Sequence, residues 1–528
     1  MRAERSRTSA VLLAFALGLA HALSLSIAGL WWLQLISFGL LALLLTTAVS
    51  TQAPKPTGTA FLKPAILGFT FGLGWFVAGV SWLFISMNRY GGLPAPLAAT
   101  ALLIFCAYLA LFPAAASALA SALCRQGKHR HSKFGLTGYA LAFSGAFTLF
   151  ELLRGWLFTG FPWLAPGYAH VDGPLSAVAP LIGSFGVGAA ACLLGALITL
   201  TLAAALRGRR LPITPLLVCI AVAAASLLAK QVNWGVTAGS VIRADLIQGN
   251  IAQDMKFDPA RTRAAMLAYA QALVPGRAQL IVMPETAWTL PWPMTPPEIT
   301  ARIRSALGDG ALAAIGMPLA AADGSPRLTN SVAVIDSSGG AVARYDKVHL
   351  VPFGEFIPWG FRWFVNMMNI PLGDFGRGAV DQAMLQLDRH AVAFNICYED
   401  LFGDELARQV RAGANLLINV SNIAWFGDSH AHEQHLQIAR MRALELARPM
   451  LRATNTGVTA AIDHRGQVIA RLPGHEFGTL SVSIAPATGL TPFARWANLP
   501  AWLLAIGLLV VGCWLARQAD PLECRALQ

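Results

Sequence analysis

Long apolar runs dominate the first half of the chain and stop shortly before residue 240. A helix that crosses a bilayer needs ~20 predominantly apolar residues. Seven such runs precede a more polar region, and one more follows it. They lie near residues 9–25, 30–49, 64–87, 96–123, 135–154, 176–206, 212–229 and 499–516. The pattern predicts a polytopic α-helical membrane domain with eight spans.

The region between Val241 and Ile484 has a different hydrophobic pattern. Short apolar stretches such as "HAVAFNIC" and "NLLINVS" read as buried strands, and stretches such as 432–448 read as amphipathic helices. About 240 residues of this alternation suit one α/β domain. We therefore expect a seven-span transmembrane domain over 1–235, an α/β domain over 236–488, and a final span with a short tail over 489–528.

Composition supports a membrane protein. Of the residues, 55% are hydrophobic and 12% are charged, whereas soluble domains carry roughly 25% charged residues. The net charge of +12 could suggest a nucleic-acid partner. Many basic residues, however, lie in short connections between apolar runs, such as "CRQGKHRHSK" and "RGRR". That distribution is typical of polytopic membrane proteins, so we expect no nucleic-acid partner.

The basic connections also predict an orientation. Lys and Arg precede the first run and follow the second, fourth, sixth and eighth, whereas the alternate connection "SMNRYGGLP" has only Arg89. Basic connections stay in the cytoplasm. Both termini are then cytoplasmic, and the α/β domain is periplasmic in a bacterial inner membrane. A cleaved signal peptide ending near "AHA" is an alternative for the first run. An uncleaved span is favoured because another apolar run follows almost at once.

One cysteine stands apart from the others. Cys397, in "VAFNICYEDLFGDEL", is the only cysteine in the predicted α/β domain. Oxidising compartments favour paired cysteines, so an unpaired one there is either a buried structural residue or a reactive thiol. Its acidic neighbours Glu399 and Asp400 should raise the thiol pKa and suppress reactivity. A reactive thiol would therefore need a nearby cation.

Two other stretches could supply the missing chemistry. Glu285 follows the strand-like "LIVMPE" and could act as the base that a thiol nucleophile needs. Lys347, in "RYDKVHLVPFGEFIP", could offset the acids around Cys397 and hold a developing oxyanion. Spacing alone does not single out these three residues.

The three stretches together resemble a known superfamily. "PE" at a strand end, "YDKVHLVPFGE" and "ICYED" are similar to motifs of the nitrilase, or carbon–nitrogen hydrolase, superfamily. That resemblance implies an αββα sandwich with a Glu–Lys–Cys triad. Four further stretches extend the resemblance to the apolipoprotein N-acyltransferase family over nearly the whole chain. They are "LIQGNIAQDMKFD", "VSNIAWFGDS", "ARMRALELARPMLRATNTGVTA" and "ELLRGWLFTGFPWLAPGY".

The resemblance implies an activity. Members of this family move an acyl chain from a phospholipid to the α-amino group of the N-terminal diacylglyceryl-cysteine of an apolipoprotein, which completes lipoprotein maturation. The implied mechanism is ping-pong, through a thioester on the cysteine. By resemblance, Glu285 is the base, Lys347 stabilises the oxyanion and Cys397 is the nucleophile. The residues implied to support this site are Glu355, Tyr398 and Glu399.

Aromatic residues are the candidates for contact with the lipid substrates. The family can carry Trp where this chain has Phe257. Trp359, Phe361 and Trp363 belong to an apolar loop that also includes Phe364, Met367 and Met368. This loop is either a lid that dips into the membrane or part of the domain's own core.

We expect neither a metal nor a cofactor. The histidines of "HAHEQH", His430–His435, do not have the H-E-x-x-H spacing of a zinc site. The expected partners are a phospholipid donor and a diacylglyceryl-modified apolipoprotein acceptor, and we expect a monomer.

Two other functions remain open at the level of sequence. A membrane-tethered amidase or nitrile hydrolase would share the triad and release the acyl group to water, but seven preceding spans are hard to justify for a soluble substrate. A non-catalytic lipoprotein-binding membrane protein would carry a degenerate domain, which the intact Glu285, Lys347 and Cys397 argue against.

Overall fold

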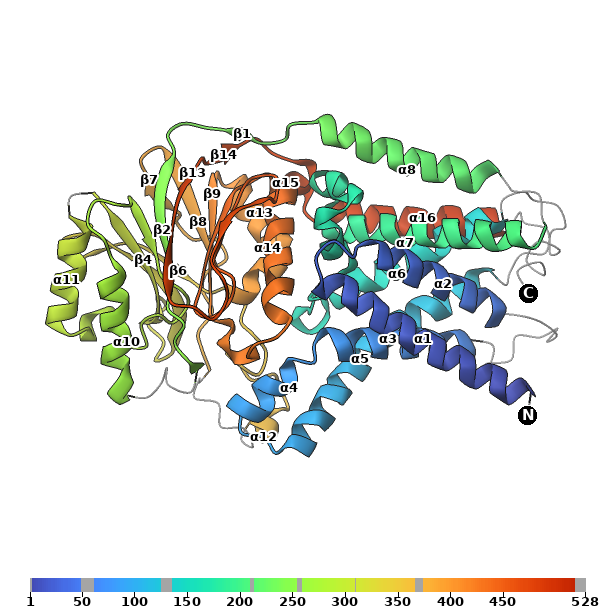
Figure 1. The fold of residues 1–528 in the computed structure, drawn as a ribbon, viewed down its shortest axis with the longest axis horizontal. Helices are drawn as coiled ribbons and strands as arrows, with labels where there is room; N and C mark the ends of the chain where they lie inside the picture. Colours follow the sequence, from blue (N-terminus) through green and yellow to red (C-terminus); the bar gives the residue numbers. More distant parts are fainter. Residues whose placement is uncertain are drawn as a thin grey trace. The chain divides into compact units, whose positions relative to one another are not determined.

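The computed structural model describes residues 2–48, 61–124, 135–208, 213–253, 259–308, 310–365 and 374–517 (Figure 1). The chain forms two compact units. The helical unit comprises Met1–Ser81, Ala99–Asn233 and Trp496–Gln528, and the α/β unit comprises Trp82–Ala98 and Trp234–Arg495. The structure adds one feature to the division expected from sequence, because residues 82–98, which connect two apolar helices, belong to the α/β unit.

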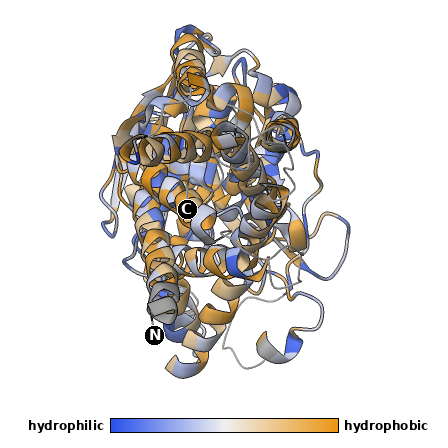
Figure 2. Cartoon of the chain, turned by 90° about the vertical axis from the view of Figure 1, so that its right-hand side faces the viewer, coloured by the Kyte–Doolittle hydropathy of each residue, from blue (hydrophilic) through white to orange (hydrophobic). Residues whose placement is uncertain are grey.

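The helical unit is built from long apolar helices (Figure 2). They are α1 (Arg2–Ser26), α2 (Trp32–Ala48), α3 (Leu62–Gly79), α5 (Ala95–Cys124), α6 (Gly135–Arg154), α7 (Ala179–Leu206), α8 (Ile213–Gln231) and α16 (Leu499–Arg517). In the described ranges, seven helical segments are long and apolar enough to cross a membrane, and Trp32–Thr47 is a shorter apolar helix. The predicted helical membrane domain is thus confirmed. Seven of the eight expected spans are long enough to cross a membrane, and the helix at Trp32–Thr47 is shorter.

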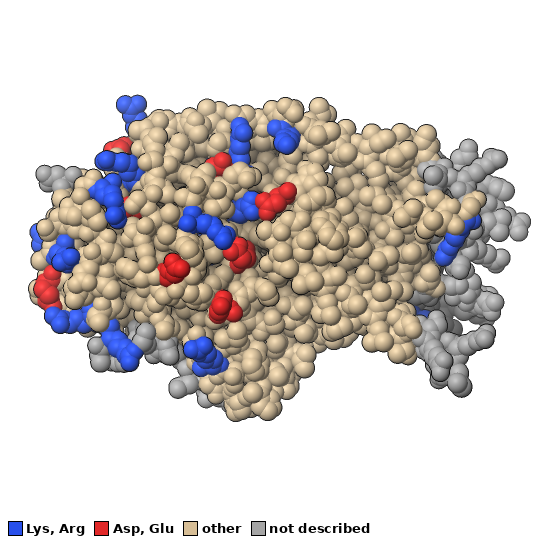
Figure 3. Space-filling view, viewed as in Figure 1, with Lys and Arg blue, Asp and Glu red and all other residues tan. Residues whose placement is uncertain are grey.

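Charged side chains are distributed very differently. On the face drawn in Figure 3, the Lys, Arg, Asp and Glu side chains lie mostly over the α/β unit. The helices of the other unit present few charges there, as expected for surfaces that contact lipid.

The last helix returns to the helical unit and packs on α6 through glycines. A Cβ at Gly138 would lie 2.7 Å from the backbone nitrogen of Ala516, and one at Gly145 would lie 2.7 Å from that of Leu509. On α16 itself, a Cβ at Gly512 would collide with the backbone of Ala142. Small residues at such contacts let two membrane helices approach closely, which favours van der Waals packing.

The α/β unit contains two six-stranded sheets. One has the order β13-β2-β3-β4-β5-β6 and the other β12-β11-β10-β9-β8-β7. The strands of the first are β2 (Ile242–Gln248), β3 (Leu280–Val282), β4 (Leu312–Ala320), β5 (Leu328–Ile335), β6 (Ala341–Asp346) and β13 (Gly478–Ile484). Those of the second are β7 (Leu385–Leu387), β8 (His390–Ile396), β9 (Leu416–Ser421), β10 (Met450–Thr454), β11 (Ala460–Ile462) and β12 (Val468–Arg471). A short pair, β1 (Val236–Thr237) with β14 (Ala487–Thr488), completes the strands.

The sheets pack face to face with helices outside them (Figure 1). Side chains from both, such as Leu246, Val282 and Ile418, share one apolar core. Alternate residues of the first sheet, including Ile247, face a second core with α10 (Pro259–Ala272) and α11 (Pro297–Leu307), as the period of two along a strand requires. Helices α13 (Gly403–Arg411) and α14 (Ala431–Leu446) lie on the outer side of the other sheet. This is the αββα sandwich that the resemblance implied, and that prediction is confirmed.

Parallel strands occupy the middle of both sheets. In one sheet β2, β3 and β4 run parallel, and in the other β8, β9 and β10 do. In open α/β sheets, ligands bind at the carboxyl ends of such strands. The residues that follow β3, β8 and β9 are therefore the first place to look for a site.

A matched pair of glycine substitutions on α16 tests the helix contact. Gly512→Leu would force a side chain into the α6 backbone, whereas at Gly507 a Cβ meets nothing within 4 Å. We expect Gly512→Leu to cost about 3 kcal/mol, the upper end for overpacking, and Gly507→Leu to cost much less. Thermal unfolding in detergent measures both. Equal losses of Tm in the two variants would contradict the packing described.

Candidate active site

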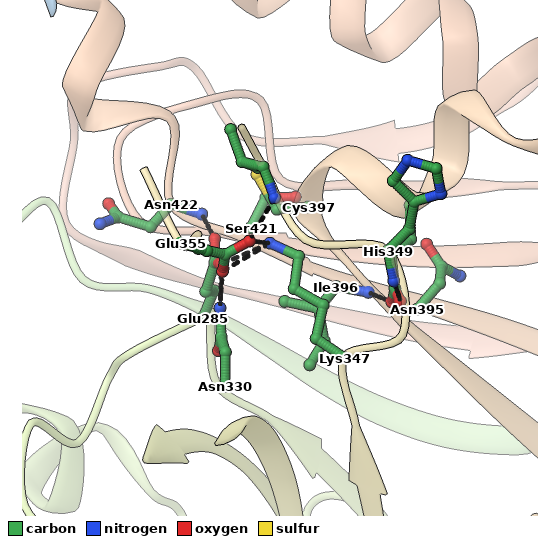
Figure 4. Close-up of polar contacts among 12 residues, drawn as sticks. Glu285, Asn330, Lys347, His349, Glu355, Asn395, Ile396, Cys397, Ser421 and Asn422 are labelled. Carbon is green, nitrogen blue, oxygen red and sulfur yellow. Dashed lines mark hydrogen bonds and ion pairs between the residues drawn. The ribbon is translucent and has the colours of Figure 1, made fainter. Parts of the chain in front are cut away.

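Glu285, Lys347 and Cys397 each follow the end of a strand. Glu285 comes three residues after β3, Lys347 directly follows β6, and Cys397 directly follows β8. Figure 4 shows the three side chains pointing toward one another, together with Glu355. Both sheets therefore contribute to one site: the acid and the lysine come from one sheet, and the cysteine from the other.

A buried ion-pair network surrounds Lys347. The side chain is 1% exposed, and its ammonium lies 2.9 Å from the carboxylate of Glu355 and 3.4 Å from that of Glu285. Burial opposes the charge on Lys347, but the two carboxylates more than offset this and raise the pKa of Lys347 above its usual value. Lys347 is therefore positively charged at neutral pH.

The two carboxylates are held in place by neutral donors. Asn330, on β5, donates from Nδ2 to Glu285 at 2.7 Å and to Glu355 at 2.6 Å. The second oxygen of Glu285 accepts the backbone N–H of Asn422 at 2.8 Å, and the second oxygen of Glu355 accepts that of Val351 at 2.8 Å. Both acids are thus oriented by several bonds and have little freedom to turn.

Cys397 occupies a strained turn. Its φ is +53°, a left-handed conformation that residues with a side chain adopt only when their surroundings hold them there. The carbonyl of Cys397 accepts a bond from Asn419 Nδ2 at 3.2 Å. The turn from Cys397 to Leu401 is a 3₁₀ helix. This arrangement presents a half-buried thiol at the end of β8.

The surroundings of Cys397 favour the protonated thiol. Burial raises the pKa of Cys397 well above its usual value, Glu285 raises it further, and Lys347 lowers it by less. The sequence-based expectation that Lys347 offsets the acids around Cys397 is therefore met only in part. A thiol with a raised pKa needs a base to take its proton when it reacts, and Glu285 is the carboxylate that raises the pKa of Cys397 most.

Glu399 ties the lysine loop to the cysteine turn. One carboxylate oxygen accepts the backbone N–H groups of Val348 and His349 at 2.7 and 3.0 Å. The other accepts the hydroxyl of Tyr345 at 2.9 Å and the N–H of Ile396 at 2.7 Å. Burial raises the pKa of Glu399 to about 7, although Lys347 lowers it. The side chain bridges the segments that carry Lys347 and Cys397.

Tyr398 packs among other rings. Its ring meets those of Phe402 at 5.3 Å and His349 at 5.8 Å between centroids, and the residue is buried. His349 in turn lies 2.8 Å from Glu405 through Nδ1. Tyr398 therefore helps to fix the turn that carries Cys397.

A charged network that the sequence reasoning missed lies next to this turn. Asp400 contacts His435 Nε2 at 2.9 Å and Arg452 Nη1 at 3.2 Å, and all three side chains are fully buried. Arg452 and His435 are also joined at 2.6 Å. Burial lowers the pKa of His435, as does Arg452. No local sequence pattern connects these three residues. The sequence showed only that charged residues occur in otherwise apolar strand and helix segments, which indicates buried charge.

The structure describes some of the aromatic residues that were predicted to contact the lipid substrates. Trp359 is 98% exposed, Trp363 is 62% exposed and Phe361 is 45% exposed. Phe361 meets the ring of Phe353 at 5.4 Å. The rings of Trp359 and Trp363 are therefore not part of the domain core. Outside the described residues lie Phe257, Met367, Met368 and the side chain of Phe364.

The histidine-rich segment belongs to α14. His435 joins the Asp400 network, and His432 stacks on His475 at 4.8 Å between ring centroids. Within the ranges that the structure covers, no group of three or more His, Cys, Asp or Glu side chains is arranged to hold a metal ion.

Comparisons with known proteins match both halves of the chain. Residues 243–491 match the family described as carbon-nitrogen hydrolase, and residues 17–197 match the apolipoprotein N-acyltransferase N-terminal domain. Among solved structures, a mutant of the Nesterenkonia AN1 amidase of the nitrilase superfamily is similar, with 19% identity, a TM-score of 0.36, and coverage of 49% of this chain and 94% of that one.

Full-length relatives carry one name. The apolipoprotein N-acyltransferase of Ralstonia nicotianae is 45% identical, with 96% of this chain and 93% of that protein covered. The one from Verminephrobacter eiseniae is 44% identical, covering 90% of this chain and 88% of that protein. On this likeness along nearly its whole length, the chain belongs to the apolipoprotein N-acyltransferase family.

Proposed function

We propose that this chain transfers an acyl chain from a phospholipid to the α-amino group of the N-terminal diacylglyceryl-cysteine of an apolipoprotein. The observation that carries this proposal is the buried network in which Lys347 contacts Glu285 and Glu355, with the Cys397 side chain pointing toward it (Figure 4). A base, a fixed cation and a thiol in one site are the parts that acyl transfer through a thioester requires.

In the first half-reaction, Glu285 takes the proton of Cys397 as the sulfur attacks the ester carbonyl of a phospholipid. The C–S bond forms, and the carbonyl electrons move onto oxygen. Lys347 and a backbone N–H near Tyr398 stabilise this oxyanion. The oxyanion then collapses, the lysophospholipid oxygen leaves with the proton held by Glu285, and a thioester remains on Cys397.

In the second half-reaction, the amine of the diacylglyceryl-cysteine attacks the thioester. An α-amino group has a pKa of ~7.7–8.0, so a useful fraction is neutral near pH 7. Glu285 accepts a proton from the attacking nitrogen, the amide forms, and the sulfur leaves as the thiol regains its proton. The sequence is ping-pong, and it consumes no cofactor.

The supporting residues have separate roles in this scheme. Glu355 keeps Lys347 charged and in position, through the 2.9 Å ion pair. Glu399 fixes the spacing between the lysine loop and the cysteine turn through its four bonds. Tyr398 packs the turn against neighbouring rings.

The membrane spans suit a reaction between two lipids. Moving an acyl chain into water costs ~0.8 kcal/mol per CH₂, so a site at the bilayer surface avoids most of that cost. We propose an inner-membrane monomer with both termini cytoplasmic and the catalytic domain, over 236–488, in the periplasm. The spans over 1–235 and 489–528 anchor it. Phe257, Trp359, Phe361 and Trp363 are proposed to contact the acyl chains, with the exposed rings serving as a lid.

Intact mass spectrometry tests the proposed function. The purified protein, incubated with phospholipid and no amine acceptor, should gain the mass of one acyl chain. Cys397→Ala should abolish the gain, and Cys219→Ser, on α8, should keep it. An adduct that persists in Cys397→Ala would contradict the nucleophile assignment. Absence of an adduct together with hydrolysis of small amides would favour an amidase instead.

A lysine substitution tests the oxyanion role. Lys347→Met should slow adduct formation by about 10²- to 10³-fold, the usual effect of removing an oxyanion-stabilising group. Because Lys347→Met leaves two buried carboxylates without their cation, the double variant Lys347→Met/Glu355→Gln serves as a better-folded companion. Lys230→Met, at an exposed position on α8, is the control and should react normally. Adduct formation within about threefold of the native rate in a folded Lys347→Met sample would rule out this role.

The pKa of Glu399 predicts a pH-dependent stability. Its folded pKa of about 7 lies above the ordinary value of 4.5, so its contribution to stability is fully present below pH 4.5 and is lost as the pH rises through 7. The Tm of the native protein minus that of Glu399→Gln should therefore decrease across this window. Glu298→Gln is the control, because Arg263 lowers the pKa of that exposed acid and the trend should not appear. A difference that stays constant or grows would contradict the assignment.

A further inference from the structure

A segment between two membrane helices packs onto the catalytic site's supporting loop. Residues Trp82–Tyr90, which we name the clamp segment, consist of α4 (Leu83–Ile85) and a π-helix at Ser86–Tyr90. They belong to the α/β unit, although their neighbours in sequence are the apolar helices α3 and α5. π-helical turns are rare and are found frequently at functional sites.

Aromatic rings of the clamp segment pack against the turn at Ile423–Phe426. The ring of Trp82 lies 4.2 Å from that of Phe426, and the ring of Tyr90 lies edge-on to that of Trp425 at 5.9 Å between centroids. Ile85 packs against the backbone of Gly427, where a Cβ would lie 3.1 Å from its side chain. These contacts lie at the end of the turn, at Trp425, Phe426 and Gly427.

Trp82 also reaches α14. Its indole Nε1 donates to Oε1 of Gln434 at 3.1 Å, and the bond is buried. Gln434 precedes His435, which contacts Asp400 in the turn that carries Cys397. One indole therefore joins the loop after β9 to the helix that braces the nucleophile's turn.

The turn that the clamp segment contacts begins directly after Asn422, which orients Glu285. Asn422 donates its backbone N–H to Glu285 at 2.8 Å. Its side chain donates to Gln253 at 2.8 Å and accepts a bond from Asn455 at 3.0 Å. The position of this N–H depends on where the following turn sits, and the clamp segment packs against that turn. A displacement of this turn would weaken the bond from the Asn422 N–H, which is one of the bonds that orient Glu285.

We propose that the clamp segment is a positioning element for the acyl transfer reaction, in which Trp82 keeps the Asn422 N–H within hydrogen-bond distance of Glu285. This proposal rests on the proposed role of Glu285 as the base. In this arrangement a connection between two membrane spans takes part in building the site. The part of the chain that matches the carbon-nitrogen hydrolase family, residues 243–491, does not include the clamp segment.

Two substitutions remove the buried bond while retaining most of the packing. Trp82→Phe keeps a ring against Phe426 and lacks the Nε1 donor, and Gln434→Met keeps the side-chain length and lacks the acceptor. Trp292→Phe is the matched control. It removes an indole bond, of 3.0 Å to the carbonyl of Gly339, elsewhere in the same unit.

The readout is the rate of acyl adduct formation on Cys397 as a function of phospholipid concentration, measured by rapid quench and intact mass. We expect the saturating rate to fall about tenfold in Trp82→Phe and in Gln434→Met, because a misplaced catalytic group slows chemistry steeply. The half-saturating phospholipid concentration should change by less than about twofold, since binding is not the function affected. The double variant should be no slower than either single variant, and Trp292→Phe should match the native rate.

Other results would overturn the proposal. These are native rates in Trp82→Phe and Gln434→Met, additive losses in the double variant, or an equal loss in Trp292→Phe. If the native protein forms no acyl adduct at all, the proposed function fails. The clamp is then tested separately by the rate at which iodoacetamide alkylates Cys397, because thiol deprotonation by Glu285 precedes alkylation. That rate should fall in both single variants, and an unchanged rate would overturn the clamp role on its own.

Discussion

The site depends on a buried ammonium between two carboxylates. Isolating Lys347 from water without Glu285 and Glu355 would cost several kcal/mol, and each acid would be equally unfavourable without the lysine. The three charges must therefore fold together. Asn330 and the backbone N–H groups of Asn422 and Val351 supply the remaining bonds of the acids. The geometry of Glu285 and of Lys347 is thus a consequence of satisfying buried charge.

The same constraint shapes the chemistry at Cys397. Two carboxylates and one lysine leave the site without a surplus of positive charge, and the thiol pKa stays high. In the proposed mechanism, a high pKa keeps the Cys397 thiol unreactive until a substrate carbonyl is present and the proton passes to Glu285. In the periplasm, where we propose that this domain lies, a protonated thiol is an advantage, because the thiolate is the form that oxidises readily.

Hydrophobic pattern and motif resemblance predicted much of this protein. The apolar runs located the membrane helices, because spanning a bilayer imposes a length and a composition that sequence displays directly. Resemblance pointed to the sandwich and to Glu285, Lys347 and Cys397. It did not find Asn330, whose role depends on β5 lying beside β6. Nor did it find the Asp400–His435–Arg452 network or the contact of Trp82 with Gln434, since these join residues that are distant in sequence. Such contacts become visible only when the strands and helices are assembled.

We propose that the acyl group passes through Cys397 to an amine. The most direct measurement is to isolate the acylated protein free of phospholipid and to add either buffer or a diacylglyceryl lipopeptide with a free α-amino group. If Cys397 passes the acyl group to the amine, the acyl mass should leave the protein rapidly with the lipopeptide and appear as an N-acyl product, and it should persist in buffer. Equal rates of loss in both, with free fatty acid as the product, would contradict it.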